Sequence, residues 1–275
     1  MKEQFVEIGN IQTLINFKVK DNFVVLSFGT FKLKILSETY SEFRFYIGQE
    51  YKKEYLKQVL FVDDKNKIIR YFCAKASKTT YCEKEAKSKL ARKFPSMDKD
   101  AIEAAIAYLI NTKLINDNNY VIQYLDYFNS AYYGKYYIIN FFSNKGISKD
   151  LIDNIPFDED KEKEKAINYF GLIKNKFVSK NYAKQKRNIY DSLLKHGFGT
   201  DIATELISSL QIDEKLERKK LAADYIRAKN KYSNKKQKDN VQTNKIVSYL
   251  VSAGYNYEDI NDIIEVDKRG ELDND

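Results

Sequence analysis

Three glycines at nearly equal spacing are the feature that most constrains how this chain folds. Apolar residues stand eight and four positions before Gly146, Gly197 and Gly254, and another apolar residue follows each directly. Side chains four apart lie on one face of a helix, and glycine readily adopts the left-handed conformation that ends a helix. The pattern predicts three helices that each stop at a glycine. The residues before the glycines are Ile138 and Phe142, Ile189 and Leu193, and Ile246 and Leu250, and those after them are Ile147, Phe198 and Tyr255.

A signal for a new helix follows each of these glycines. The residues two positions on are acceptable N-caps, and those four positions on are acidic, as the first turn of a helix favours. They are Ser148, Gly199 and Asn256, followed by Asp150, Asp201 and Glu258. An earlier copy has Phe94 in place of glycine, with Ala86 and Leu90 before it and Ser96 after it. The anchors at 94, 146, 197 and 254 are 52, 51 and 57 residues apart, a period typical of stacked helical repeats.

The start of the chain has a different pattern. Residues 14–19 and 31–35 alternate apolar and polar side chains, and turn signals at 20–22 and 28–30 separate them. This favours a small antiparallel meander, packed on a helix predicted for residues 50–60. We therefore expect a mainly α-helical protein, with tandem three-helix repeats in a curved, elongated solenoid after an N-terminal β-rich module. The expected segments are 1–62 for the module and its helix, then repeats at 63–114, 115–157, 158–211 and 212–275, the last with a C-terminal tail.

The charge of the chain is locally clustered. The formal net charge is +8, which favours a polyanionic partner. Basic runs stand at similar positions of the first, third and fourth repeats, and equivalent positions of a solenoid line one face. We expect a basic ribbon there that binds DNA or an acidic filament groove, although any single lysine is better explained as a solvated surface residue. The candidates are Arg70, Lys75, Lys78, Lys84 and Lys87; Lys174, Lys176, Lys180, Lys184, Lys186 and Arg187; and Arg227, Lys229, Lys231, Lys235, Lys236 and Lys238.

The second repeat interrupts this ribbon with aromatic residues. Tyr132, Tyr133 and Lys135 occupy the corresponding position and complete the set of candidate contact residues. The tyrosines could stack on bases or anchor an interface. The alternative is that they pack between helices, and the periodicity favours this for about half of the tyrosines in the segment.

No pattern in the sequence indicates an enzyme. It contains no glycine-rich phosphate loop, no HExxH and no Gly-x-Ser-x-Gly, so we expect no catalytic residue, metal or cofactor. The single histidine, His196, precedes Gly197 and suits a capping or cationic role at a helix end. The paired acids at 63–64, 158–160 and 213–214 are interpreted as linker or helix N-terminal charges.

The cysteines and the hydropathy of the sequence indicate the cellular compartment in which the protein is expected. Cys73 and Cys82 form no CxxC pair, which favours free thiols in a reducing cytosol. No stretch of about 18 apolar residues occurs, so we expect a cytoplasmic protein without a membrane partner.

The order of several motifs resembles the RecX family. The central run comprises Lys93-Phe94, residues 102–109, Leu114-Ile115-Asn116-Asp117, Gly134-Lys135 and Lys145-Gly146-Ile147-Ser148. Upstream, residues 78–90 are similar to the first repeat of that family, and the β-rich start followed by residues 47–50 is similar to the N-terminal extension of its longer members. The resemblance covers most of the chain, most clearly residues 65–200. Phe94, the aromatic segment 120–142 and the scarcity of arginine depart from the family pattern.

The resemblance implies a regulator of the RecA recombinase. Members of this family lodge in the groove of a RecA–DNA filament, impede ATP turnover and strand exchange, and bind single-stranded or duplex DNA more weakly. We expect this chain to be a monomer. The corresponding processes are homologous recombination, DNA repair and the SOS response. The alternative from the residues alone is a sequence-independent nucleic-acid-binding repeat protein, and a third possibility is a scaffold for an unrelated acidic protein.

Overall fold

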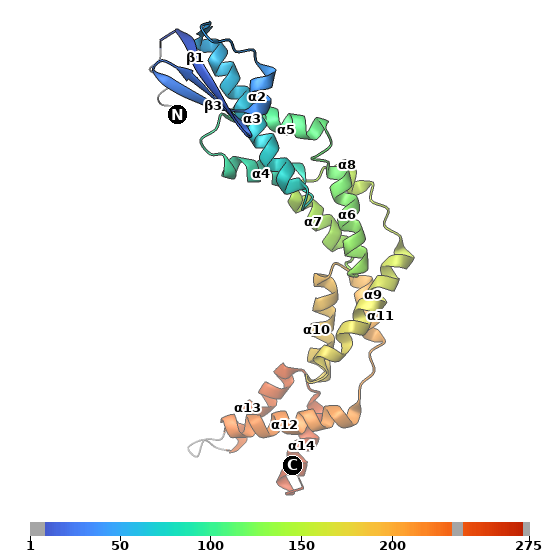
Figure 1. Ribbon diagram of the computed structural model, residues 1–275. Helices are drawn as coiled ribbons and strands as arrows, with labels where there is room; N and C mark the ends of the chain where they lie inside the picture. Colours follow the sequence, from blue (N-terminus) through green and yellow to red (C-terminus); the bar gives the residue numbers. More distant parts are fainter. Residues whose placement is uncertain (1–8, 233–238, 272–275) are drawn as a thin grey trace. The chain divides into compact units, whose positions relative to one another are not determined.

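The computed structural model describes residues 9–232 and 239–271. They form a mainly helical chain that begins with a four-stranded antiparallel sheet, as the sequence predicts (Figure 1). Two compact units are present among them. One comprises residues 9–123 and 143–151, and the other comprises 124–142, 152–232 and 239–271. Helices α6, α7 and α8 contribute residues to both units. The solenoid arrangement of the whole chain remains a prediction.

Three strands come first, a short helix separates them from the fourth strand, and the remaining elements are helices. The strands are β1 (Ile11–Lys20), β2 (Phe23–Phe28), β3 (Phe31–Leu36) and β4 (Glu50–Lys52). The first helices are α2 (Ser37–Glu42), α3 (Lys53–Ala76), α4 (Glu83–Lys93), α5 (Lys99–Asn111), α6 (Asp117–Ser130), α7 (Lys135–Lys145) and α8 (Lys149–Asp153). They are followed by α9 (Glu159–Ile173), the 3-10 helix η1 (Lys174–Phe177), α10 (Tyr182–Lys195), α11 (Thr200–Ser208), α12 (Glu214–Tyr232), α13 (Asp239–Ala253) and α14 (Tyr257–Lys268).

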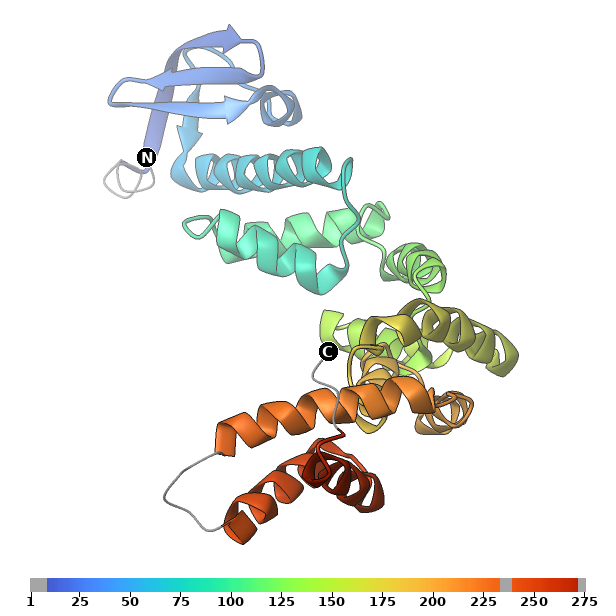
Figure 2. The same cartoon turned by 90° about the horizontal axis from the view of Figure 1, so that it is seen from below.

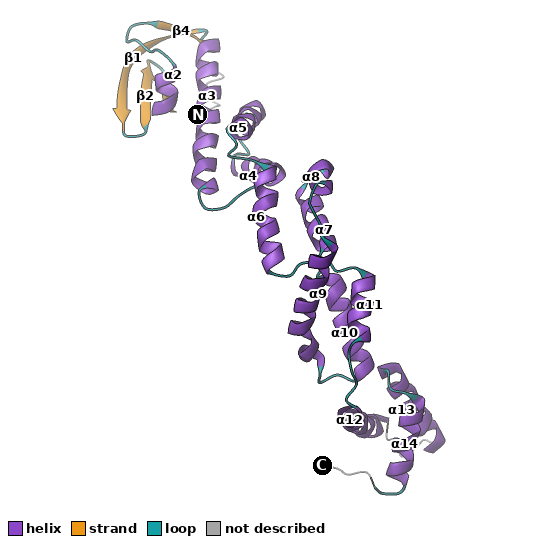
Figure 3. Cartoon of the chain, turned by 90° about the vertical axis from the view of Figure 1, so that its right-hand side faces the viewer, coloured by secondary structure: helices purple, strands orange, loops and turns teal. Residues whose placement is uncertain are grey.

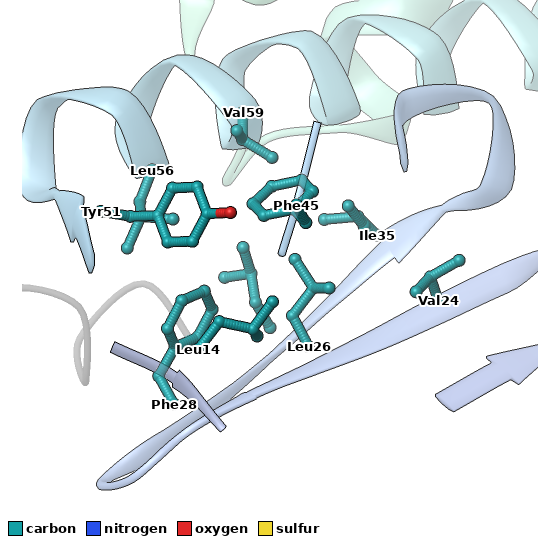
Figure 4. Packing of buried hydrophobic residues seen from close by; sticks show 10 residues of the cluster. Leu14, Val24, Leu26, Phe28, Ile35, Phe45, Tyr51, Leu56 and Val59 are labelled. Atoms are coloured by element: carbon teal, nitrogen blue, oxygen red, sulfur yellow. The ribbon is translucent and has the colours of Figure 1, made fainter. Parts of the chain in front are cut away.

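The N-terminal sheet has the strand order β3-β2-β1-β4, and α3 covers one of its faces (Figure 2). Because side chains alternate along a strand, Leu14, Leu26 and Ile35 all point to this face. They pack against Leu56 and Val59 of α3 (Figure 4). The predicted meander on a helix is confirmed, with β4 and α2 in addition. The helix is longer than predicted, since α3 runs unbroken across the segment boundary expected between residues 62 and 63.

Asp63 ties α3 to the end of the sheet. Its side chain is fully buried in the middle of α3, where Oδ1 accepts hydrogen bonds from the Leu36 amide at 2.7 Å and the Thr39 hydroxyl at 3.1 Å. Lys67, one turn later, forms an ion pair with its other oxygen. The interpretation of residues 63–64 as linker charges is therefore wrong. The buried carboxylate is stabilised by the two donors to Oδ1 and by the charge of Lys67 next to Oδ2, which accepts no hydrogen bond from the described residues.

Replacing Asp63 is expected to destabilise the N-terminal unit. Asp63→Ala leaves the Leu36 amide, the Thr39 hydroxyl and the Lys67 ammonium without their acceptor, at a cost of about 3 kcal/mol. Hydrogen exchange of the β2 and β3 amides measures this loss. Lys57→Ala, an exposed change on the same helix, should alter exchange by less than about 0.5 kcal/mol. Equal protection in the two variants would show that Asp63 does not hold the sheet to α3.

The glycine pattern predicts the helix ends correctly. Gly146, Gly197 and Gly254 have φ values of 78°, 95° and 103°, in the left-handed region that few other residues adopt at low cost. New helices begin directly after the predicted caps at 148, 199 and 256. The apolar residues eight and four positions before each glycine, and the one after it, are all buried.

The earliest copy of the pattern differs at its cap. Phe94 ends α4 with a φ of −123°, and α5 is capped by Asp98, whose side chain accepts from the Asp100 amide. The prediction of Ser96 as the cap is wrong. Without a glycine, and with Pro95 fixing the backbone, the chain makes an extra turn in which the Met97 amide donates to the Phe94 carbonyl at 3.2 Å.

Each of the three glycines of the repeat pattern packs against the start of an earlier helix. A Cβ on Gly146 would lie 2.6 Å from the Lys84 side chain at the start of α4, and one on Gly254 would lie 2.6 Å from Ala183 at the start of α10. A Cβ on Gly197 would lie only 2.3 Å from the Tyr137 amide nitrogen of α7. We call these three contacts the junctions. The first lies in the N-terminal unit, and the other two lie in the C-terminal unit.

Hydrogen bonds at equivalent positions recur at the junctions, although their donors differ. The carbonyl of the residue before each glycine accepts from the residue before the earlier helix. The donors are Cys82 Sγ to Lys145 at 3.4 Å, the Gly134 amide to His196 at 2.9 Å, and Asn181 Nδ2 to Ala253 at 2.8 Å. The acceptors are main-chain carbonyls in all three junctions. The earlier helix is therefore held by the backbone of the glycine turn and not by a particular side chain.

A carboxylate from the second helix further along the chain caps each of these earlier helices. The first amide of α4 donates to Asp117 at 2.8 Å, that of α7 to Glu162 at 2.6 Å, and that of α10 to Glu217 at 2.7 Å. Negative charge is favoured at a helix N-terminus because the unpaired amides and the helix dipole point there. Because the capping residue comes from a later helix, the cap also connects two helices that are not consecutive in the chain.

A lysine one turn after the cap completes two junctions. Lys165 pairs with Glu162 at 2.8 Å and donates to the Tyr133 carbonyl at 3.0 Å. Lys220 pairs with Glu217 at 3.4 Å and donates to the Lys180 carbonyl at 2.7 Å. Each lysine therefore holds the main chain just before the helix that its glutamate caps.

A substitution at Gly197 is expected to disrupt its junction. Gly197→Ala combines a strained left-handed backbone with a clash against Tyr137, at a cost of about 3 kcal/mol or more. Gly171→Ala is the matched control, since Gly171 lies inside α9 with open space around it and alanine there should stabilise by about 0.5–1 kcal/mol. Denaturant unfolding of the two variants should shift in opposite directions. A tolerated Gly197→Ala would show that the close approach is not required.

Candidate partner-binding surface

The third basic run forms an exposed cluster without acidic partners. Two members lie in η1, one in the following loop and two in α10. All five are exposed, and none forms an ion pair with any residue that the structure describes. We call them the η1–α10 cluster: Lys174, Lys176, Lys180, Lys184 and Arg187. The sixth predicted member, Lys186, is half-buried with its ammonium 5.1 Å from the centre of the Tyr182 ring.

Local structure fixes the backbone of this cluster. Asn181 caps α10 by accepting from the Lys184 amide at 2.8 Å, and Gln185 Nε2 donates to the Lys174 carbonyl at 3.3 Å. Phe177 is partly buried in the core of α9, α10 and α11. Lys220 binds the Lys180 carbonyl at the junction, which leaves the Lys180 side chain exposed. These contacts fix the main chain from which the side chains of the η1–α10 cluster extend.

Two of the described members of the fourth basic run form ion pairs with acidic residues. Arg227 and Lys229 lie within α12, which extends to Tyr232. Arg227 pairs with Asp224 at 3.0 Å and Lys229 with Asp267 at 2.6 Å. Burial would raise the pKa of Asp267, but hydrogen bonds from Lys229 and Tyr225 hold it below its usual value.

The remaining members of the fourth run divide into two groups. The Lys231 ammonium lies 5.2 Å from the ring centres of Tyr232 and Tyr249. Lys235, Lys236 and Lys238 lie outside the described residues.

The residues of the first basic run are exposed, but most of them interact with neighbouring side chains or carbonyls. Arg70 lies 3.8 Å from Glu38, and hydrogen bonding to Glu83 raises the pKa of Lys87. Lys84 donates to the Asn144 carbonyl at 3.2 Å beside the first junction. Lys75 lies 5.8 Å from the Tyr71 ring centre, and Lys78 is exposed. The alignment of the three basic runs on one face remains a prediction.

Most of the aromatic residues that interrupt the basic ribbon pack against other side chains of the protein. The rings of Tyr169, His196, Tyr133 and Tyr137 form a continuous stack, with successive centroids 3.7, 4.1 and 4.2 Å apart. Neighbours cover both faces of Tyr133, which contradicts the predicted stacking of this ring on a base. Half-buried Tyr132 has a positive φ of 56° in the turn between α6 and α7. Lys135 is exposed, and its ammonium is 5.5 Å from the Phe157 ring centre.

His196 is the C-cap of α10 and belongs to this stack. Its Nε2 lies 3.1 Å from the Ala131 carbonyl. Burial lowers its pKa below the usual 6.5, and the Ala131 carbonyl offsets part of that effect. The predicted capping position is confirmed, but the cationic role is disfavoured because the buried site favours the neutral ring.

The stability of the C-terminal unit should therefore fall in mild acid. The unfolded chain takes up a proton near pH 6.5 while the folded protein resists it, so stability is lost as pH falls from 6.5 through the lower folded pKa. The titration of the single imidazole by proton NMR gives the folded pKa directly. His196→Phe, which keeps an aromatic ring in the stack, should lose this component of the pH dependence. A folded pKa at or above 6.5 would contradict the assignment.

No metal site is evident among the residues that the structure describes, since no three His, Cys, Asp or Glu side chains gather to hold an ion. Within the same residues, no helix is both long and apolar enough to cross a membrane. The structure so far defines a mainly helical protein with recurring junctions, an N-terminal antiparallel sheet and an exposed basic cluster.

Comparisons with known proteins identify the family. No family model matches the chain. It is 30% identical over 172 residues to the regulatory protein RecX of Clostridium perfringens strain 13, covering 60% of this chain and 76% of that protein. It is 31% identical over 140 residues to RecX of Clostridium beijerinckii, covering 48% of this chain and 63% of that relative, less than two thirds of its length. The chain belongs to the RecX family of regulatory proteins.

A solved structure agrees with this assignment at the level of the fold. The crystal structure of a regulatory protein RecX matches 72% of this chain and all of that chain, with a TM-score of 0.59 and 15% sequence identity.

Proposed function

We propose that this protein binds the groove of a RecA–DNA filament and inhibits RecA ATP hydrolysis and strand exchange. Its membership of the RecX family supports a role in RecA regulation. That role would place it in the cytoplasm, in recombinational DNA repair and the SOS response. It would act by binding, without catalysis.

The observation that carries this proposal is the η1–α10 cluster. Five exposed cations stand together without a described acidic partner, whereas the charges of Arg227 and Lys229 are already paired. Unpaired surface cations keep their full attraction for phosphates or for an acidic protein groove. The cluster is thus the described part of the basic ribbon best suited to a polyanionic partner.

Inhibition would follow from bridging several RecA subunits. When one basic segment is bound, each further contact is intramolecular, so modest contacts can sum to tight binding. A protein that spans neighbouring subunits favours the arrangement in which all contacts are made. Subunits that must move during nucleotide turnover would then be held in place.

The second candidate is direct, sequence-independent binding of nucleic acid. The same cluster favours it, because lysine and arginine contacts to phosphates need no base recognition. Such binding weakens steeply with salt as counterions are released, whereas filament binding through apolar contacts would persist.

Neutralising the cluster is expected to relieve RecA inhibition. Lys174→Gln, Lys176→Gln, Lys180→Gln and Lys184→Gln are combined, and the concentration that half-inhibits DNA-stimulated ATP hydrolysis by the cognate RecA should rise by roughly tenfold. The control combines the same change at four dispersed, exposed lysines: Lys57, Lys99, Lys149 and Lys161. It should inhibit like the unaltered protein. Unchanged hydrolysis at saturating unaltered protein would contradict the proposal itself.

Two salt concentrations separate the candidates. If the protein binds RecA-coated single strands at high salt but releases bare DNA, filament binding is supported. If both affinities fall together with salt, direct nucleic-acid binding is the better account. Binding to neither would favour an unrelated acidic partner.

A further inference from the structure

The outer face of the N-terminal sheet carries a second basic surface, separate from the basic ribbon. The inner face packs on α3, and Figure 3 shows α2 and α3 together on one side of the sheet. On the other face, four lysines of β1 and β3 flank apolar residues of β2. We call this the lysine face: Lys18, Lys20, Lys32, Lys34, Phe23 and Val25.

Strand register places these residues side by side. Lys18 of β1 and Lys34 of β3 stand on either side of Val25 in β2, and Lys20 is opposite Phe23. Directly opposed residues of antiparallel strands share a face. The Lys34 ammonium lies 4.1 Å from the centre of the Phe23 ring, which confirms that these two residues share the outer face.

Acidic residues of this region lie mostly on the helix side. Glu38 approaches Arg70 of α3 at 3.8 Å, and Glu42 accepts from Asn66 of the same helix at 2.8 Å. Among the described strands, the acid on the outer face is Glu50 in β4, opposite Thr13 and away from the lysine pairs. All four lysines are exposed, and none has an ion pair with a described residue. Asp21 lies in the exposed turn directly after Lys20 and forms no ion pair with it, so the face is basic among the described residues.

We propose that the lysine face binds single-stranded nucleic acid. Lysines two apart on one strand are separated by about 7 Å and can follow the phosphates of an extended strand. Phe23 lies between the lysine rows with the Lys34 ammonium over its ring. When a nucleotide binds, the ammonium can turn to the phosphate, which leaves this face of the ring to the base. Duplex DNA offers the phosphates but keeps its base faces stacked, so the apolar strip favours single strands.

This inference goes beyond the proposed function and its second candidate, since it assigns single-strand binding to residues outside the η1–α10 cluster. It is tested on the full-length chain with a fluorescent oligothymidylate of about 16 nucleotides and a duplex of the same length. The lysine-face variant combines Lys18→Gln, Lys20→Gln, Lys32→Gln and Lys34→Gln. The control again combines Lys57→Gln, Lys99→Gln, Lys149→Gln and Lys161→Gln, which removes the same charge.

The lysine-face variant is expected to bind the oligothymidylate roughly tenfold or more weakly, and the slope of log affinity against log salt should flatten by about 2 to 3. Phe23→Leu keeps the apolar bulk but loses stacking, so it should weaken single-strand binding about fivefold or more and leave duplex binding unchanged. Both measurements are repeated with the η1–α10 cluster neutralised, which keeps the outcome independent of the proposed function.

Three results would overturn the inference. The first is unchanged single-strand affinity in the lysine-face variant. The second is an equal loss in the control, which would indicate an effect of net charge alone. The third is a normal affinity for single strands together with lost binding to the RecA filament, which would identify the face as a protein contact.

Discussion

The carboxylate caps at the junctions are the interaction on which the rest of the helical structure depends. A glutamate or aspartate from one helix satisfies the first amide of an earlier one, at 2.6–2.8 Å in all three junctions. The glycine turn that closes each later helix supplies the matching main-chain carbonyl. Because both partners of each contact are backbone or a short polar side chain, the junctions specify position more strictly than apolar packing alone would.

The junctions also connect the fold to the proposed binding surface. Lys220 holds the Lys180 carbonyl while its partner Glu217 caps α10, and the η1–α10 cluster is carried on this same stretch of chain. The cations are thus presented from a fixed backbone, which reduces the conformational entropy lost when a partner binds. Arg227 and Lys229 in α12, by contrast, are paired with Asp224 and Asp267 and have less charge to offer a partner.

The sequence predicted the periodic features well and the individual partners poorly. Helix ends followed from Gly146, Gly197 and Gly254, because a left-handed stop leaves a local signature. The burial of Asp63, the stack around Tyr133 and the pairing of Lys229 with Asp267 depend on residues distant in the chain, which no local pattern indicates. One signal in the sequence was missed. Glu162 and Lys165 recur as Glu217 and Lys220, each 55 residues later, and both pairs cap a helix and hold the main chain before it.

Photo-crosslinking from position 180 tests most directly whether the η1–α10 cluster contacts the RecA–DNA filament. A photoreactive amino acid replaces Lys180 in the full-length chain, and the protein is irradiated with cognate RecA assembled on single-stranded DNA. The account predicts a covalent product with RecA or its DNA that depends on filament assembly, and no such product when the same probe replaces Lys57. Equal products from the two positions, or none from position 180 under conditions where the protein binds the filament, would contradict it.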